Sequence, residues 1–423
     1  MIVYKFGGAS VNSAKSVRNA AEIVKRQGEA PMVIVISAMG KSTNALEQML
    51  PQTCNVRERE ERLKKLYDYH RQIVLDLYGE NSGPALSAID SLFIQLDHEL
   101  SLPPTDYNND YDRIVCFGEL ISTTIVSNYF NHIGIANRWM DARNLIRTNS
   151  THREGHIDWT TTQKNISALG TTLRDDSTTT IAITQGFIGG ADDGSTTTLG
   201  REGSDYSAAV FAFCLDASKM VIWKDVPGFL NADPHFFNNT IKIDQMPYNE
   251  AIELSYHGAS VIHPKTVKPL QNKEIPLYVK SFLTPEAEGS IVGPFKHLKP
   301  STPLYIIRPN QTLLSIATRD FSFIAEDGLQ QIFGHFASAG IRINMMQNSA
   351  LSFSACIDHN ELLLHELIEH LNPSYNVRYN SGLHLITIRY YTQEIIDHIV
   401  NGRTILLEQR SRITEQVVVD AND

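Results

Sequence analysis

A polar, glycine-rich stretch, Thr198–Ala209, carries residue types that suit the binding of a small anion. Apolar residues at helical spacing occupy Tyr206–Leu215, and Ser204 or Asp205 would cap the start of that helix. Arg201 would then lie beside a helix N-terminus, where free N–H groups and the helix dipole attract negative charge. Its guanidinium can hold a carboxylate through two parallel hydrogen bonds. A glycine-rich turn with surface charges explains the stretch equally well.

A second candidate group follows the first expected strand, Ile2–Phe6. Gly7 and Gly8 form a turn before an expected helix at 13–27, and Lys5 lies at the end of the strand. Glycines in such a turn let backbone N–H groups approach a phosphate, and the lysine adds a positive charge. The G-x-G-x-x-G spacing of dinucleotide-binding proteins is absent. The turn indicates a phosphate site, with a tight turn and an exposed lysine as the alternative.

Two hydroxyl side chains follow the next apolar run, Met32–Ile36. Ser37 and Thr43 lie at the expected strand–helix junction and are candidates for holding a polar ligand. The neighbouring Gly40-Lys41-Ser42 is similar to the end of a P-loop. The glycine that a P-loop requires five positions earlier is Val35, so we exclude that motif.

Glu119 is a lone carboxylate in an otherwise apolar segment, Ile114–Ser122. A carboxylate in such surroundings needs a cationic partner, either a structural arginine or the ammonium group of an amino-acid ligand. Asp225 directly follows the expected strand Met220–Trp223, at its carboxyl end. Ligands of open α/β sheets bind at that edge, so both carboxylates are candidate site residues.

The elements that must position these groups alternate between strand and helix, which predicts an open, mostly parallel α/β sheet with helices on both faces. Strands are expected at 2–6, 32–36, 135–140, 180–184 and 220–223. Helices are expected at 13–27, in two stretches over 56–100, and at 114–132, 206–215, 248–256 and 265–271. Loops are expected at 103–110 and 186–195.

The pattern changes after a proline-rich segment at 285–303, which we interpret as a domain boundary. The order strand, helix, strand, strand, helix, strand then predicts a ferredoxin-like βαββαβ unit. Its elements are expected at 312–318, 328–338, 341–347, 352–358, 361–370 and 375–379. Residues 383–423 add a strand, a helix and two strands, which is too short for a second full copy.

The composition of the 423-residue chain is that of an ordinary globular protein, with 42% hydrophobic and 20% charged residues. A net charge of −10 argues against nucleic acid or an anionic membrane as the main partner. The four cysteines are scattered without metal-type pairing, and no signal peptide or membrane span is expected. These features predict a soluble, cytoplasmic protein.

Taken together, the motifs resemble those of aspartokinase, the ATP-dependent enzyme that phosphorylates the side-chain carboxylate of aspartate. Seven ordered motifs carry the resemblance: Lys5–Gly8, Ser37–Gly40, Phe117–Thr123, Gln185–Phe187, Thr197–Asp205, Trp223–Gly228 and Gly258–Pro264. No homoserine dehydrogenase domain follows, so the chain resembles the monofunctional type. The resemblance implies catalysis of the first step of the pathway to lysine, threonine and methionine.

The resemblance also implies an architecture and a set of partners. Residues 1–290 would form the amino-acid kinase fold, 304–380 a first regulatory ACT module, and 381–423 a partial second module that 304–308 could complete. The family commonly forms a homodimer through these modules and binds a feedback inhibitor there, lysine or threonine. Mg²⁺ would bridge the phosphates of ATP largely through water and phosphate oxygens, so no protein metal site is expected.

Site roles follow from the resemblance residue by residue. Catalysis is assigned to Lys5 and Asp205, and Lys5 with the amides of Gly7 and Gly8 would hold the transferring phosphoryl group. Arg201 would bind the α-carboxylate of aspartate and Glu119 its ammonium group. The residues expected to shape the rest of the substrate pocket are Ser37, Thr43 and Ser204.

The expected ATP-binding residues depart from the family pattern at three positions. Ser260 replaces a lysine, His235 replaces an arginine, and Leu230 replaces a tyrosine. Lys224 or Lys265 could supply the missing positive charge near the nucleotide. The full set expected to bind ATP is Lys5, Gly7, Gly8, Lys224, Asp225, Leu230, His235 and Ser260.

An effector site is expected in the first ACT module, where the turn before a helix at Gly328 would face a polar strand end. The residues assigned to it are Gly328, Leu329, Asn344, Gln347 and Asn348. Asn344 and Gln347 could instead only satisfy turn and interface hydrogen bonds. Two other functions stay open for the whole chain: a related small-molecule kinase for glutamate, acetylglutamate or a nucleotide, and a catalytically silent amino-acid sensor.

Overall fold

The computed structural model describes residues 1–27, 31–176, 178–259, 261–320 and 322–421. The chain forms two units. The N-terminal unit comprises Met1–Phe229, Lys242–Ile252 and Ser260–Pro300, and the C-terminal unit comprises Leu230–Ile241, Glu253–Ala259 and Ser301–Asp423. Within the described residues, no helix combines the length and the apolar character that crossing a membrane requires.

An eight-stranded sheet organises the N-terminal unit. In spatial order its strands are β11 (Gln245–Pro247), β13 (Ser290–Gly293), β12 (Leu277–Ser281), β8 (Lys219–Lys224), β1 (Ile2–Phe6), β2 (Met32–Ile36), β5 (Ile181–Gln185) and β3 (Arg138–Met140). All neighbouring pairs are parallel except β12 and β13. The predicted mostly parallel sheet is confirmed.

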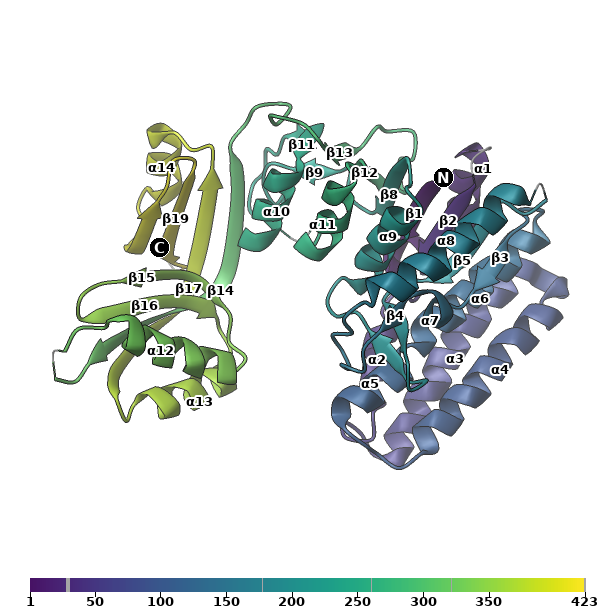
Figure 1. Cartoon of the computed structure of the whole chain (residues 1–423), viewed down its shortest axis with the longest axis horizontal. Coiled ribbons are helices and arrows are strands. Elements are labelled where there is room, and N and C mark those ends of the chain that lie inside the picture. The colour runs from purple at the N-terminus through teal and green to yellow at the C-terminus, as the bar shows by residue number, and fades with distance from the viewer. Residues whose placement is uncertain (28–30, 177, 260, 321, 422–423) are drawn as a thin grey trace. The chain divides into compact units, whose positions relative to one another are not determined.

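Alternate side chains of β1 face two different layers of helices. Ile2, Tyr4 and Phe6 pack into a large apolar core together with side chains of α1 (Ala14–Gln27), α3 (Val56–Tyr78), α4 (Gly83–Ser101) and α6 (Phe117–His132). The blue helices α3, α4 and α6 lie together in Figure 1. The other layer contains α9 (Gly203–Cys214), which contacts β1, β2 and β8 and is flanked by α8 (Trp159–Asp175) and α11 (Pro264–Asn272).

Shorter elements connect these layers. They are η1 (Gly8–Val11), α2 (Ser42–Glu47), η2 (Gly79–Asn81), α5 (Tyr107–Val115), α7 (Ala142–Leu145), β4 (Arg147–Thr148), β6 (Ile188–Ala191), β7 (Thr196–Thr198), β9 (Phe229–Leu230), β10 (Lys242–Ile243) and α10 (Tyr248–His257). The strands β4, β6 and β7 form a small sheet of their own. The expected loop at 186–195 is therefore partly wrong, because β6 pairs with β7 as a hairpin.

The expected loop at 103–110 is also partly wrong, because α5 begins inside it. The side chain of Asp106 accepts hydrogen bonds from the backbone N–H groups of Asn108 (2.9 Å) and Asn109 (3.3 Å). This N-cap satisfies donors that would otherwise have no partner, so the polar residues after it are helical. The helix expected from 114 is accordingly two helices: α5 ends at Val115 and α6 begins at Phe117.

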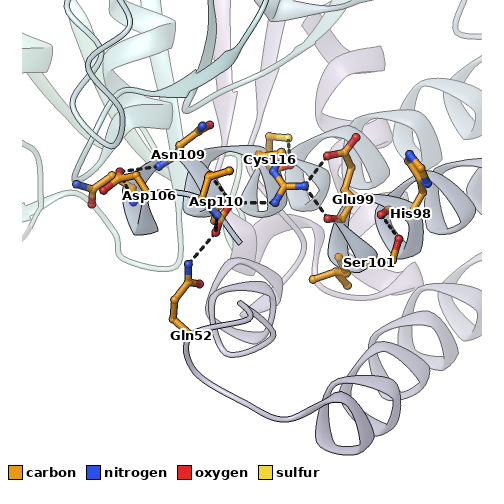
Figure 2. A network of polar contacts seen from close by, with 12 residues as sticks. Gln52, His98, Glu99, Ser101, Asp106, Asn109, Asp110 and Cys116 are labelled. Carbon is orange, nitrogen blue, oxygen red and sulfur yellow. Dashed lines mark hydrogen bonds and ion pairs between the residues drawn. The ribbon is translucent and has the colours of Figure 1, made fainter. Parts of the chain in front are cut away.

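A network of polar contacts holds α5 in place (Figure 2). Asp110 accepts hydrogen bonds from Gln52 Nε2 (2.7 Å), Thr105 N (2.9 Å) and Arg113 NH2 (2.8 Å). The same guanidinium donates to Glu99 at 2.9 Å, and Glu99 and Asp110 are both labelled in Figure 2. These bonds fix the helix that carries Tyr111 and Asp112.

The C-terminal unit contains a six-stranded antiparallel sheet. Its strands are, in spatial order, β15 (Ile343–Asn348), β16 (Ser352–Asp358), β14 (Leu304–Thr318), β17 (Tyr375–Arg389), β19 (Thr414–Asp420) and β18 (Ile405–Arg410). The start of β14 pairs with the end of β17, and the end of β14 pairs with the start of β17. These two long strands therefore join two βα modules into one sheet.

The helices of this unit are α12 (Glu326–Ser338), α13 (Glu361–Leu371) and α14 (Gln393–Val400). The first two pack with β14 and β16 around Leu314, Phe353 and Ile332, while α14 packs with β17 and β19. The predicted element order of the C-terminal region is confirmed with one difference: the strands expected at 375–379 and after residue 383 are one long strand, β17. The helix expected from 328 begins earlier, at Glu326, where two acidic residues in the first turn suit the helix dipole.

Candidate active site

Two lysines reach one face of the central sheet at its carboxyl-terminal edge. Lys5 pairs with Ile222 of β8 and with Val35 of β2. Side chains alternate along a strand, so Lys224, two residues beyond Ile222, points to the same face as Lys5. Ser37 lies two residues beyond Val35, at the same edge. This is the face that α9 covers.

Asp205, in the first turn of α9, binds both lysines. Its Oδ1 lies 2.6 Å from Lys5 Nζ and its Oδ2 lies 3.4 Å from Lys224 Nζ. Burial opposes ionisation of the carboxyl, but the attraction of the two ammonium groups is stronger and lowers the pKa of Asp205. Lys224 also donates a hydrogen bond to the carbonyl of Val261. One ionised carboxylate thus holds two cations together.

The glycine turn after β1 lies against the loop that follows β2. A Cβ atom at Gly8 would be 2.8 Å from the carbonyl oxygen of Ala38 and 2.9 Å from that of Gly40. Only glycine permits such a close backbone approach. A Cβ atom at Gly7 would lie 3.4 Å from Lys5 Nζ. The open backbone of this turn beside a lysine suits a phosphate group.

Glu119 lies in the first turn of α6 and is 2% exposed. Its Oε1 accepts a hydrogen bond from the backbone N–H of Ala38 (3.2 Å), while Oε2 is buried without a hydrogen-bond partner among the described residues. Burial raises the pKa of Glu119 to about 8, although the Ala38 hydrogen bond and the charge of Lys5 act in the opposite direction. A ligand ammonium group would supply the missing partner.

These side chains line one cleft with a volume of about 830 Å³. The predicted site residues that line it are Lys5, Gly8, Ser37, Thr43, Glu119, Arg201, Ser204, Asp205 and Lys224. The other residues of the lining are Ala38, Gly40, Asn108, Tyr111, His152, Arg153, Glu154, Phe187, Thr198, Gly200, Glu202 and Gly203. Segments far apart in the sequence therefore contribute anion-binding and cation-binding groups to the same space.

The helix α9 begins before the predicted N-cap. Glu202, with φ of 54°, is the N-cap residue and Gly203 is the first helical residue. A Cβ atom at Gly203 would lie 2.7 Å from the ring of Phe187, so a glycine is needed where the helix starts. Ser204 and Asp205 consequently lie in the first turn, and the N-cap prediction was wrong for both. Arg201 is exposed and lies two residues before the helix.

Among the described residues expected to bind ATP, Gly7, Asp225, Leu230 and His235 are not in the lining of this cleft. Asp225 is exposed in the turn after β8. Leu230 and His235 belong to the C-terminal unit, where Asp233 accepts a hydrogen bond from the His235 backbone N–H at 2.8 Å. Ser260 lies outside the described residues. Lys265 is near the cleft, because a Cβ atom at Gly200 would be 3.8 Å from its Nζ.

The sequence analysis missed several residues of the cleft. Arg153 and His152 come from a polar loop after β4. Tyr111 comes from α5, of which the part up to residue 110 was expected to be a loop and only the part from residue 114 to be helical. Asp112 is fully buried and accepts a hydrogen bond from Thr198 Oγ1 at 2.6 Å. It also contacts the backbone N–H of Arg153 and the ring of His152. A buried aspartate in a helix is a signal that the sequence alone does not reveal, since burial depends on packing.

The residues expected to form an effector site lie in the C-terminal unit. Asn344, at a bulge of β15, donates hydrogen bonds to Gln311 Oε1 and Asp358 Oδ1, each at 2.9 Å. Its Oδ1 is buried and has no hydrogen-bond partner in the described part of the chain. Gln347 and Asn348 are exposed on the same strand. Gly328 and Leu329 lie within the first turn of α12 rather than in a turn before it.

Comparison with known families identifies the class of protein to which this fold and site belong. Residues 1–281 match the amino acid kinase family. Two relatives are informative. The chain is 30% identical over 397 residues to lysine-sensitive aspartokinase 3 of Escherichia coli, covering 92% of this chain and 86% of that protein. It is 33% identical over 385 residues to the chloroplastic aspartokinase 1 of Arabidopsis thaliana, covering 87% of this chain but only 65% of that relative.

A solved structure agrees with these relatives. The structure of E. coli aspartokinase III in complex with aspartate and ADP, in the R-state, superimposes with a TM-score of 0.85 at 27% identity. The match covers 100% of this chain and 97% of the other. The chain therefore belongs to the aspartokinases, and its C-terminal antiparallel sheet corresponds to ACT-type modules.

Proposed function

We propose that the protein transfers the γ-phosphoryl group of ATP to the side-chain carboxylate of L-aspartate, which yields 4-phospho-L-aspartate and ADP. The observation that carries this proposal is the distribution of charge in one cleft. A buried carboxylate without a full set of partners, Glu119, suits an ammonium group, and the exposed guanidinium of Arg201 suits a carboxylate. Lys5 and Lys224, joined by Asp205, suit a phosphoryl group.

The reaction needs no strong base. The attacking carboxylate of aspartate is already ionised at neutral pH, so one of its oxygens can form the new bond to the γ-phosphorus directly. The bond from phosphorus to the β–γ bridging oxygen breaks, and ADP leaves with that electron pair. Positioning and charge neutralisation then determine the rate. Lys5 would stabilise the charge of the transferring group beside the backbone of Gly7 and Gly8.

Asp205 has a positioning role in this mechanism. Its pKa is lowered and both of its oxygens face lysines, so it is not a proton acceptor for the substrate. It keeps Lys5 and Lys224 near each other despite their mutual repulsion. Ser37, Thr43 and Ser204 line the rest of the pocket and can donate hydrogen bonds to the substrate.

ATP and Mg²⁺ are the expected co-substrate and cofactor. The described residues contain no group of three or more histidine, cysteine or acidic side chains that could hold a metal. As the resemblance implies, Mg²⁺ would be held largely by phosphate oxygens and water, and it would reduce the negative charge of the nucleotide. Lys224 lines the cleft and can supply the positive charge that the family has at position 260. Asp225, Leu230 and His235 remain predicted nucleotide contacts.

Regulation is the second part of the proposal. An amino acid, lysine or threonine, would bind at the first ACT module near Asn344, whose buried Oδ1 can accept a hydrogen bond from an ammonium group. The E. coli relative is named for its sensitivity to lysine, which supports lysine as the first effector to test. We further propose a cytoplasmic homodimer joined through the ACT modules, acting in the pathway to lysine, threonine and methionine.

ADP formation tests the proposed activity. Purified protein with ATP and Mg²⁺ is given L-aspartate, L-glutamate or no acceptor, and ADP is measured by a coupled assay. The proposal predicts ADP formation that depends on aspartate, loss of that activity in Lys5→Ala, and no loss in the control Lys25→Ala, an exposed lysine on α1. ADP formation that is equal with glutamate would indicate a different carboxylate kinase, and none with either would indicate a sensor.

A further inference from the structure

Arg153 is held in an unusual backbone conformation at the wall of the cleft. Its φ is 65°, in the left-handed region that residues other than glycine rarely adopt. Its backbone N–H donates to Asp112 Oδ2 at 2.9 Å, and His152 Nδ1 lies 3.0 Å from the same oxygen. Thr198 donates to the other oxygen of this buried carboxylate. A strained residue persists only where its surroundings determine its position, as they do here.

The side chain of Arg153 is also oriented, but its charge is poorly neutralised. The guanidinium lies over the ring of Tyr111, 4.2 Å from the centroid, and 5.5 Å from that of Tyr107. Its ion-pair partner among the described residues is Glu47, in a single contact of 3.5 Å. Both side chains are more than a third exposed, and such pairs contribute only about 0–1 kcal/mol. Most of the five N–H donors thus remain available to a ligand.

Arg153 and Arg201 lie on connected parts of the cleft lining. The backbone N–H of Gly155 donates to the carbonyl of Thr198 at 2.8 Å, which joins the Arg153 loop to the strand that leads to Arg201. A Cβ atom at Gly200 would lie 3.3 Å from the carbonyl oxygen of Arg153. Both arginines line the same cleft. A carboxylate bound at Arg201 therefore enters the field of a second cation.

We propose that Arg153 is a substrate-binding residue that recognises, together with Arg201, the α-carboxylate of the amino-acid substrate; this inference rests on the proposed function. The side-chain carboxylate of aspartate must reach Lys5 to react, so the α-carboxylate is the anion that remains for the two arginines. Stacking on Tyr111 fixes the plane of the Arg153 guanidinium before the substrate arrives, which reduces the entropy lost on binding. Arg153 would thus select acceptors that carry an α-carboxylate.

The test compares Arg153→Met, which keeps an apolar side chain over Tyr111, with Arg153→Lys, which keeps the charge. Arg147→Met is the matched control, because Arg147 lies in the same segment but donates to Ala191 and Asp192 outside the cleft lining. Kd for L-aspartate is measured by calorimetry, and kcat and KM for both substrates by ADP formation. The second ligand is the α-carboxamide of aspartate, which has no α-carboxylate charge.

We expect Arg153→Met to raise Kd and KM for aspartate by about 10- to 100-fold, as for the loss of a charged contact to a ligand, with KM for ATP unchanged. Arg153→Lys should restore part of the affinity, and Arg147→Met should behave as the unmodified protein. The carboxamide should bind weakly to the unmodified protein and lose little more affinity in Arg153→Met. If the two losses of affinity are not additive, the side chain of Arg153 and the α-carboxylate of aspartate interact with each other.

Two results would overturn the inference. One is an unchanged Kd for aspartate in a folded Arg153→Met protein; the other is an equal loss of affinity for aspartate and its carboxamide, which would indicate a structural role. The proposed function fails separately if the unmodified protein binds aspartate in the calorimeter but does not convert ATP to ADP when aspartate is present. In that case the comparison of Kd values still decides the role of Arg153.

Discussion

Glu119 should make the binding of aspartate depend strongly on pH between 6 and 8. Burial raises its pKa to about 8 in the free protein, so the carboxyl is mostly protonated at neutral pH. A neutral carboxyl cannot attract an ammonium group as a carboxylate does. The proton must therefore leave when aspartate binds, and binding becomes more favourable as pH rises towards the pKa.

The size of the effect follows from this pKa. With a value of about 8, the fraction of free protein that is ready to bind rises about fiftyfold between pH 6 and pH 8, and Kd should fall by the same factor. Binding at pH 7 should release about 0.9 proton. The raised pKa also means that the contribution of Glu119 to stability is full below pH 4.5 and is lost as pH rises through about 8.

Calorimetry in buffers of different ionisation enthalpy measures Kd and proton release together. The matched variant is Glu119→Gln, whose side chain has a similar size but cannot ionise. It should bind aspartate more weakly at pH 8, by about 2–5 kcal/mol for the loss of a buried charge partner, and without the pH dependence. A Kd that is constant from pH 6 to pH 8 in the unmodified protein, with no proton release, would refute the assignment of Glu119 to the ammonium group.

Other predictions concern three separate parts of the chain. Lys5→Ala should lower kcat by about 100- to 1000-fold with an unchanged Kd for aspartate, and a kcat near normal would remove Lys5 from the mechanism. Gly8→Ala should lower Tm and weaken ATP binding, because its Cβ atom would lie 2.8 Å from the carbonyl oxygen of Ala38; the control Gly334→Ala, where a Cβ atom has no neighbour within 4 Å, should not lower Tm. Scanning calorimetry with and without ATP measures Tm and its increase on ATP binding. Equal changes of Tm in both variants would contradict the close packing at Gly8. Asn344→Ala should relieve inhibition by lysine or threonine without changing the uninhibited kcat, which effector titrations test. Unchanged inhibition would place the effector elsewhere.

The sheet could be predicted from the sequence because its signals are local. Continuous apolar runs such as Met32–Ile36 predict buried parallel strands, and the structure has that strand at the predicted residues. The parallel arrangement also implies that Lys5 and Lys224 approach the same edge. Part of the cleft lining, including Lys5, Ser37 and Lys224, could be predicted for this reason, although the roles of these residues remain predictions.

What the sequence analysis missed depends on contacts between distant segments. The start of α5 follows from capping by Asp106 and from the bonds of Asp110 to Gln52 and Arg113, which no pattern of apolar residues reveals. The early start of α9 depends on the space between Gly203 and Phe187. The backbone of Arg153, which lines the cleft, is held by a hydrogen bond to the buried carboxylate of Asp112, 41 positions away in the sequence.

The most direct test of the account is the identity of the phosphorylated carboxylate. The protein is incubated with ATP, Mg²⁺, L-aspartate and hydroxylamine, which converts an acyl phosphate into a stable hydroxamate, and the isomer is identified by NMR. With Arg201 and Glu119 holding the α-groups and Lys5 near the side chain, the account predicts only the side-chain hydroxamate, and none from Lys5→Ala. The α-isomer, or a side-chain product formed equally well by Lys5→Ala, would contradict it.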